Sequence, residues 1–454
     1  MARSLLAAAA AGLALFHGTP HADRISTANG KVDTVTCGAG RDILVADAFD
    51  RIGRDCETVS LRISVDTTQG PAQHLTEVEP SAFGFGSAVV ATFQVGRFQE
   101  GGAEAIGFST SRNAGRTWRS GLLPGLTSGG AQWTRASDPV VTYDSTHRVW
   151  LAASLALAQG GSGVTVNRST DGVTWSPAAN VVASTNPLAY DKEWIVCDNW
   201  PSSPRRGSCY IEWTDVPGGG IASQVSLDGG RTWSDPVRAT TTGFGIQPVV
   251  LPDGTLVAVV LADAQNAVLA ARSTDGGATF SSLAQLSDVR FAPSPGLRVP
   301  PLPSVAVDGA GTIAVAWPDC RFRPSCTAND IVVATSSDGT TWSPPARIVV
   351  APAGTSAVVP GLGAGGAGRF ALTYYIAGPA TVGVRTAQTL DGGATWSAPQ
   401  RLDVAPAPDV WLALTEGGRF VGDYIATAFV AGRPMPVYSL AVANQRQSIF
   451  AEVR

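Results

Sequence analysis

Apolar and polar residues alternate along most of the chain in short runs rich in Val, Ile, Ala and aromatic side chains. One run, residues 304–307, is followed by the polar stretch 308–311 and then by a second run, residues 312–317. Asp and Gly between two β-branched runs are typical of a hairpin turn. The same pattern covers residues 79–93, 138–152, 193–213, 247–261, 303–317 and 359–374. It predicts paired strands rather than helices.

A short motif follows each of these strand pairs. Its six copies begin at Ser111, Ser169, Ser226, Ser273, Ser336 and Thr389, and they end at Trp118, Trp175, Trp233, Phe280, Trp342 and Trp396. An Asp or Asn side chain accepts backbone N–H groups a few residues further on, and Gly permits a left-handed turn. The closing aromatic ring anchors the turn on the layer beneath it. We therefore interpret the motif as structural and exclude its aspartates from catalysis.

Each period contains four predicted strands, because one more strand precedes the motif and one follows it. Four strands per repeat are typical of a β-propeller blade. The final repeat, residues 421–454, ends before a motif, and residues 59–65 could supply its missing strand. The sequence thus predicts an all-β protein with a single β-propeller over residues 59–454, closed by an N-terminal strand. Seven four-stranded blades are favoured, with six as the alternative.

The six motifs and their spacing resemble the sialidase-like superfamily, whose members carry the bacterial neuraminidase repeat, or Asp-box. Three segments are similar to an exported bacterial branch labelled exo-alpha-sialidase: residues 77–80, 136–139 and 191–194. The segment 421–425 shares this similarity. The resemblance covers residues 60–454 and implies a propeller with a glycan or glycoconjugate as its partner.

The N-terminal region predicts export. A short basic start precedes an apolar run of 13 residues, 4–16, which has the length of a signal-peptide core and is too short to span a bilayer. We expect a signal peptide over residues 1–22, cleaved near Ala22, and an N-terminal extension over residues 23–58. Secretion agrees with an even number of cysteines.

The six cysteines fall into three close pairs: Cys37 with Cys56, Cys197 with Cys209, and Cys320 with Cys326. This nearest-neighbour pairing is one of 15 connectivities that six cysteines allow, and short loops favour it. A zinc site is the alternative. The chain has no CxxC motif and only four histidines, which argues against zinc.

The charge pattern argues against several classes of partner. The formal net charge is −4 over 454 residues, and no basic block occurs, so neither nucleic acid nor an anionic membrane surface is indicated. No glycine-rich loop joins a strand to a helix, and no calcium-loop pattern is found. We predict no cofactor, no metal site, no membrane span and a monomer.

The resemblance implies that the active site lies on the face away from the Asp-boxes, at the starts of the innermost strands and the ends of the second strands. Carboxylates at two such positions can act as acid and as base or nucleophile. The catalytic candidates are Asp138, Asp191, Glu193 and Tyr375. The candidates for substrate binding are Glu79, Lys192, Asp319, Arg321, Asp423 and Tyr424.

Working sialidases, as the resemblance implies, hold the substrate carboxylate with three arginines, the first in a Phe-Arg-Ile-Pro element before the first box. This chain has no such element, and we interpret the related string 297–300, after the fourth box, as coincidental. Sialic acid specificity is therefore not predicted. Two hypotheses remain: a glycoside hydrolase, and a non-catalytic propeller that binds a glycan or a protein. Under the second, the strand-start carboxylates only hold neighbouring blades together, and Asp319 and Arg321 form a bridge between blades.

Overall fold

The described residues of the computed structural model, 4–6, 14–127 and 132–453, form strands joined by turns. Within them there are two single-turn 3₁₀ helices, η1 (Pro324–Cys326) and η2 (Asp409–Trp411), and no α-helix. The all-β prediction is confirmed. No helix in this part of the chain is long and apolar enough to cross a membrane.

Most strands form consecutive antiparallel groups, in which each strand pairs with the next along the chain. The first three groups are β8 (Gln73–Phe85), β9 (Ala88–Arg97), β10 (Ala103–Ser111), β11 (Arg119–Thr127); β12 (Arg135–Asp144), β13 (Val149–Ala158), β14 (Gly161–Ser169), β15 (Ala179–Ser184); and β16 (Tyr190–Cys197), β17 (Cys209–Asp215), β18 (Ile221–Ser226), β19 (Val237–Arg238). The next three are β20 (Phe244–Val250), β21 (Leu256–Leu261), β22 (Ala267–Ser273), β23 (Ala284–Asp288); β24 (Ser304–Val307), β25 (Ile313–Asp319), β26 (Asp330–Ser336), β27 (Ala346–Val349); and β28 (Ser356–Ala364), β29 (Phe370–Ala377), β30 (Thr381–Thr389), β31 (Gln400–Arg401), with β32 (Ala407–Pro408) beside β30.

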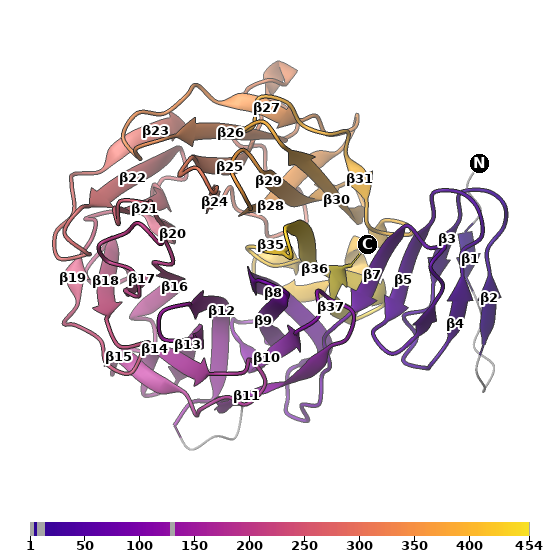
Figure 1. The fold of residues 1–454 in the computed structure, drawn as a ribbon, viewed down its shortest axis with the longest axis horizontal. Helices are drawn as coiled ribbons and strands as arrows, with labels where there is room; N and C mark the ends of the chain where they lie inside the picture. The colour runs from indigo at the N-terminus through magenta and orange to yellow at the C-terminus, as the bar shows by residue number, and fades with distance from the viewer. Residues whose placement is uncertain (1–3, 7–13, 128–131, 454) are drawn as a thin grey trace.

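Figure 1 shows these groups around a ring, with β8, β12, β16, β20, β24 and β28 nearest its middle. The hairpin of β33 (Ala413–Thr415) and β34 (Gly418–Phe420) precedes the last group, which consists of β35 (Ala426–Val430), β36 (Arg433–Ala443) and β37 (Arg446–Glu452). Apolar side chains of neighbouring groups pack together; Val259 and Trp317, for example, belong to one buried cluster. This arrangement is consistent with a sialidase-like β-propeller.

The last group obtains its fourth strand from the N-terminal region. Strand β7 (Thr58–Arg62) pairs antiparallel with β37, with Leu61 opposite Ala451. Single residue pairs also connect β37 with β8 and β10 with β12. Because these pairs merge the last, first and second groups into one larger sheet, the number of blades remains a prediction.

The N-terminal extension folds as a short solenoid of parallel strands, which the sequence analysis did not foresee. One side stacks β1 (Ser4–Leu6), β3 (Arg24–Ser26), β5 (Ile43–Asp47) and β7; the other stacks β2 (Leu15–His17), β4 (Thr34–Thr36) and β6 (Arg51–Ile52). Acidic side chains link successive coils: Asp42 accepts the N–H of Asp23 at 2.7 Å, and Asp50 accepts that of Asp33 at 2.9 Å. The solenoid projects from the ring beside β37 (Figure 1).

The predicted signal peptide, residues 1–22, lies partly outside the described residues. Its described part includes β2, which pairs with β4 in the first solenoid coil. A Cβ on Gly18 would lie 1.8 Å from the carbonyl oxygen of Cys37, so only glycine permits this close stacking. Cleavage near Ala22 would remove β2 from the solenoid, and the signal peptide remains a prediction.

The Asp-boxes form the turns between the third and fourth strands. In the third box, Asp228 accepts the N–H groups of Arg231 and Thr232 at 2.9 and 3.0 Å. In three other boxes, hydrogen bonds to the ionised carboxylate lower the pKa of Asp171, Asp275 and Asp391 to about 2. Turn chemistry therefore accounts for these aspartates.

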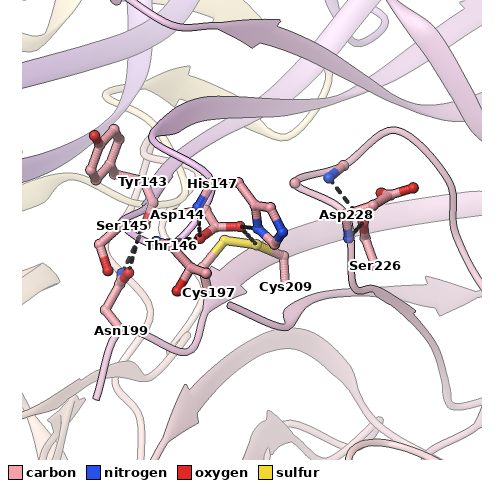
Figure 2. The surroundings of a disulfide bond; sticks show 12 residues. Tyr143, Asp144, Ser145, Thr146, His147, Cys197, Asn199, Cys209, Ser226 and Asp228 are labelled. Carbon is pink, nitrogen blue, oxygen red and sulfur yellow. Dashed lines mark hydrogen bonds and ion pairs between the residues drawn. A yellow bond between two sulfur atoms is a disulfide. The ribbon is translucent and has the colours of Figure 1, made fainter. Parts of the chain in front are cut away.

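The predicted disulfide pairing is confirmed for all three pairs. Figure 2 shows that the Cys197–Cys209 bridge lies beneath the 144–147 hairpin of the neighbouring group. Asn199 connects the two groups there, because it donates to the carbonyl of Tyr143 at 2.7 Å and accepts from the N–H of Ser145 at 2.8 Å. The bridge thus stabilises a junction between groups.

We predict that Tyr438→Phe lowers the free energy of unfolding by about 1–2 kcal/mol, because it leaves buried partners without their hydrogen bond. The Tyr438 hydroxyl donates to Ser60 of β7 at 2.6 Å and lies 3.2 Å from the Leu402 carbonyl. Urea unfolding measures the loss. Tyr143→Phe, at a half-buried hydroxyl without such bonds, is the control; equal stability of the two variants would contradict the prediction.

Candidate functional site

A repeated irregularity at the start of the inner strands builds the site. In five groups the pairing between the first and second strands shifts register near the start of the inner strand. The residue at the shift has a positive φ in each case: Glu79 (53°), Asp138 (49°), Lys192 (50°), Gly245 (67°) and Val359 (49°). A bulge of this kind breaks the two-residue alternation of a strand and re-aims its side chain. It brings Glu79, Asp138 and Lys192 to one pocket.

The Lys192 ammonium joins three carboxylates from different parts of the ring. It forms an ion pair with Asp423 and lies 3.7 Å from both Glu79 Oε1 and Asp138 Oδ2. Its side chain is only 10% exposed. Arg298 shares Asp423, with 2.7 Å between its Nη2 and Oδ2. These contacts hold the middle of β8, the first half of β12 and the segment before β35 together.

A hydrogen-bonded chain extends this cluster to a second arginine. Gln94 donates to Glu79 and, at 3.0 Å, to Ser137, and it accepts from Arg97 Nη1 at 2.8 Å. The guanidinium carbons of Arg97 and Arg298 lie 4.9 and 4.7 Å from the ring centroid of Phe420. One aromatic ring therefore orients two cations, and Arg97 Nε has no hydrogen-bond partner among the described residues.

These groups line a cavity of about 980 Å³, which we call the channel-mouth pocket. Exposed apolar side chains, Leu188 and Val216, form part of its rim. Its charged lining residues are Glu79, Arg97, Glu100, Arg135, Asp138, Asp191, Lys192 and Arg298. Cations and carboxylates in such a pocket suit a polar ligand. The described residues contain no group of three or more His, Cys, Asp or Glu side chains placed to hold a metal ion.

Asp138 and Asp191 meet at one backbone N–H. The N–H of Lys192 lies 3.3 Å from Asp138 Oδ2 and 3.0 Å from Asp191 Oδ1. The two carboxylates have opposite pKa shifts. Burial acts to raise the pKa of Asp138, but the Lys192 charge and hydrogen bonds from Glu79 and Ser137 outweigh it and lower that pKa. Asp191 lies at the mouth of the pocket. The protein around its carboxyl group displaces part of the solvent, and this effect together with the charge of Asp138 raises its pKa to about 6.

Two further predicted residues lie deeper, beside a small adjoining pocket. Burial and the charge of Asp138 raise the pKa of Glu193 well above its usual value. The hydroxyl of Tyr424 donates to the Pro139 carbonyl at 3.0 Å, and the Tyr424 ring lies edge-on to Trp194. Burial raises the Tyr424 pKa, so this phenol is not activated as a nucleophile.

Three predicted residues do not join the site. Tyr375 is buried in the core beside β36, where its hydroxyl donates to the carbonyl of Ser439 at 2.8 Å and accepts the N–H of that residue at 3.0 Å. This packing contradicts a nucleophilic role for Tyr375. Arg321 pairs with Asp319 at 2.8 Å and with Asp288 of β23 at 3.2 Å. Asp319 and Arg321 thus bridge neighbouring groups and line neither the channel-mouth pocket nor the small pocket beside it.

The sequence analysis dismissed one residue that the structure brings into the site. Arg298 belongs to the string 297–300, whose likeness to Phe-Arg-Ile-Pro we interpret as coincidental, and it lines the channel-mouth pocket. Its loop crosses to the β33–β34 hairpin, where the N–H of Arg298 donates to the Arg419 carbonyl at 2.9 Å. The sequence around Arg298 contains no pattern that predicts this contact with the hairpin.

The ring of antiparallel groups, the six Asp-box turns and the charged channel mouth define a protein of the sialidase-like superfamily. The chain belongs to the BNR repeat-like domain family, which it matches over residues 86–321, more than half of its length.

Several solved structures are similar to this chain, and one of them has a TM-score above 0.5. An ulvan lyase of a polysaccharide lyase family has a TM-score of 0.55 at 10% identity, with 86% of this chain and 95% of the lyase covered. The leech intramolecular trans-sialidase has a TM-score of 0.49 at 14% identity, with coverages of 68% and 67%. A protein of unknown function from Dyadobacter fermentans has a TM-score of 0.49 at 16% identity, with coverages of 73% and 97%. A search of curated proteins found no match.

We predict that Glu212→Gln removes part of the pH dependence of stability. Burial raises the pKa of Glu212 in β17 to about 8. Because the folded state keeps a proton that the unfolded chain releases above its ordinary pKa of 4.5, this group destabilises the fold progressively as pH rises toward 8. Between the two pKa values the free energy of unfolding falls by up to about 1.4 kcal/mol per pH unit.

Thermal unfolding from pH 5 to 9 tests this expectation, and the variant should lose less stability than the wild type as pH rises. Glu416→Gln, at an exposed carboxylate, is the matched control. Parallel curves for wild type and Glu212→Gln would contradict the raised pKa.

Proposed function

We propose that the protein is an exported glycoside hydrolase whose catalytic pair is Asp138 and Asp191. The observation that carries this proposal is their shared contact with the N–H of Lys192 together with their opposite pKa shifts. A glycosidase needs one carboxyl group that keeps its proton and a second that is ionised. The similar fold of a polysaccharide lyase supports a glycan as the substrate.

The geometry supports a retaining reaction. Asp138 Oδ2 and Asp191 Oδ1 lie 3.3 and 3.0 Å from the same Lys192 nitrogen, so they cannot be farther apart than these two distances combined. Inverting enzymes leave ~6.5 Å or more between their carboxyl groups. In the proposed mechanism Asp191 gives its proton to the glycosidic oxygen as the C–O bond breaks, and Asp138 Oδ2 bonds to the anomeric carbon. Water then replaces Asp138 and returns a proton to Asp191.

We further propose that the sugar is acidic. Arg97 and Arg298 face the pocket over one phenylalanine ring, and the unpaired Nε of Arg97 is a free donor. A guanidinium fork matches a carboxylate. Export, supported by three disulfides, and a seven-bladed propeller with β7 as the outer strand of the last blade belong to the same proposal.

A non-catalytic glycan-binding propeller is the second candidate. One observation favours it: the Asp138 carboxylate, although it lines the pocket, is only 4% exposed and lies close to Lys192. In that case the charged mouth would bind a glycan without turnover.

We expect the purified, oxidised protein to hydrolyse at least one acidic substrate in a panel of fluorogenic sialosides, uronides and neutral glycosides. Asp138→Asn and Asp191→Asn should each reduce kcat by at least about 100-fold on a substrate with a poor leaving group. Asp235→Asn, at an exposed aspartate, is the control. Glycan binding by a folded protein that cleaves no member of the panel would favour the second candidate.

The pH profile gives an independent test. Because Asp191 must be protonated, kcat should fall as pH rises above about 6. Because Asp138 must be ionised and its pKa is lowered, activity should persist to pH values below the ordinary range of an aspartate. An optimum above pH 8 in the wild type would exclude Asp191 as the acid.

A further inference from the structure

A second cavity, separate from the channel-mouth pocket, lies where the solenoid meets the ring. Its volume is about 800 Å³, and we call it the junction groove. It is bounded by the solenoid strands β5 and β7, by β30 and β31, and by β36; its charged lining residues are Arg41, Glu57, Arg369, Arg433 and Glu452. None of these residues belongs to the proposed catalytic site.

Three arginines reach this groove from three different parts of the chain. Arg41 comes from the solenoid, Arg369 from the hairpin before β29, and Arg433 from the start of β36. Among the described residues their guanidinium groups have no ion pair or hydrogen bond, and Arg369 Nε is buried without a partner. Other arginines nearby are paired, as Arg62 is with Asp47 at 2.5 Å. The groove therefore holds free guanidinium donors.

The walls of the groove are fixed by contacts between the solenoid and the ring. Gln400 Nε2 donates to Thr58 Oγ1 at 2.8 Å. Of the two acidic lining residues, Glu57 accepts the N–H of Asp42 at 2.9 Å, which holds it to the preceding solenoid coil. The rest of the lining is uncharged and includes Pro399, Pro434 and Pro436. The arginines thus line a groove in which the solenoid and the ring are in direct contact.

We propose that the junction groove binds the sulfate or carboxylate groups of an acidic polysaccharide. Guanidinium groups donate paired hydrogen bonds to planar carboxylates and to sulfate oxygens. A cavity of this size accommodates more than one sugar residue. Three arginines that line one groove can contact successive anionic groups along such a chain. The groove would hold the polymer outside the channel mouth.

Binding is measured by calorimetry on the full-length protein with three probes: a sulfated oligosaccharide, an oligogalacturonate of equal length, and inorganic sulfate. Arg41→Gln, Arg369→Gln and Arg433→Gln should each weaken binding of at least one oligosaccharide by about five- to tenfold, and added salt should weaken it further. Glu57→Gln keeps an amide oxygen for the Asp42 N–H and should strengthen binding. Arg54→Gln and Arg116→Gln, at exposed arginines outside the groove, are the controls.

The two oligosaccharides distinguish sulfate from carboxylate as the recognised group. The losses expected in the three groove variants require no catalysis at the channel mouth, so failure of the proposed catalytic function would not affect the result. Absence of oligosaccharide binding, binding of inorganic sulfate alone, or equal losses in the groove and control variants would overturn the proposal. Groove-dependent binding to anionic lipid vesicles without oligosaccharide binding would overturn it as well.

Discussion

The channel mouth depends on one buried cation. Lys192 is the group that Glu79, Asp138 and Asp423 share, and these carboxylates belong to β8, to β12 and to the segment before β35. Burial and the charge of Asp138 raise the pKa of Glu79 to about 8, so this group keeps its proton near neutral pH and donates to Asp138, while Lys192 balances the negative charge of the cluster. Arg298 supplies the second positive charge on the side of Asp423. The first, second, third and last groups therefore meet through electrostatic contacts as well as apolar packing.

The backbone that places these charges is a property of the repeat. The same register shift with a positive φ occurs at Gly245 and Val359, which carry no charge. A left-handed conformation is costly for a β-branched residue such as Val359, and it persists only because the surrounding sheet holds it. The bulge is thus general to the inner strands, whereas the chemistry arises because Glu79, Asp138 and Lys192 occupy three of its positions. A change of side chain there can alter the site without altering the fold.

Much of the architecture could be predicted from the sequence, because turn chemistry is local. The Asp-boxes and the paired cysteines follow from short spacings, and the carboxylates at the inner-strand starts follow from the resemblance to the sialidase-like superfamily. Arg298 could not be predicted, since it lies in a loop without periodicity that crosses to a distant hairpin. The prediction of a catalytic role for Tyr375 was wrong, because strand alternation does not reveal whether an aromatic ring faces the core or the channel.

The solenoid was missed although a signal was present. An aspartate directly precedes four of the short strands: Asp23, Asp33, Asp42 and Asp50. Hydrogen bonds join Asp23 to Asp42 and Asp33 to Asp50 across successive coils. Their spacing is short compared with the propeller repeat, so a search at the longer period passes over it. Strand β7 belongs to both patterns, which connects the two units through a continuous strand rather than a flexible linker.

The cation network also connects ligand binding to protonation. Arg298 and Lys192 both neutralise Asp423. If an acidic sugar binds Arg298, its carboxylate adds a negative charge near Asp138 and partly offsets the effect of the Lys192 and Arg298 charges there. The pKa of Asp138 would then rise toward that of Asp191. The same sugar carboxylate adds a negative charge near Asp191 and favours its protonated form. An acidic ligand would therefore keep the proposed acid, Asp191, protonated but reduce the ionised fraction of the proposed nucleophile, Asp138, so the position of its carboxylate relative to Arg97 and Arg298 decides which effect prevails.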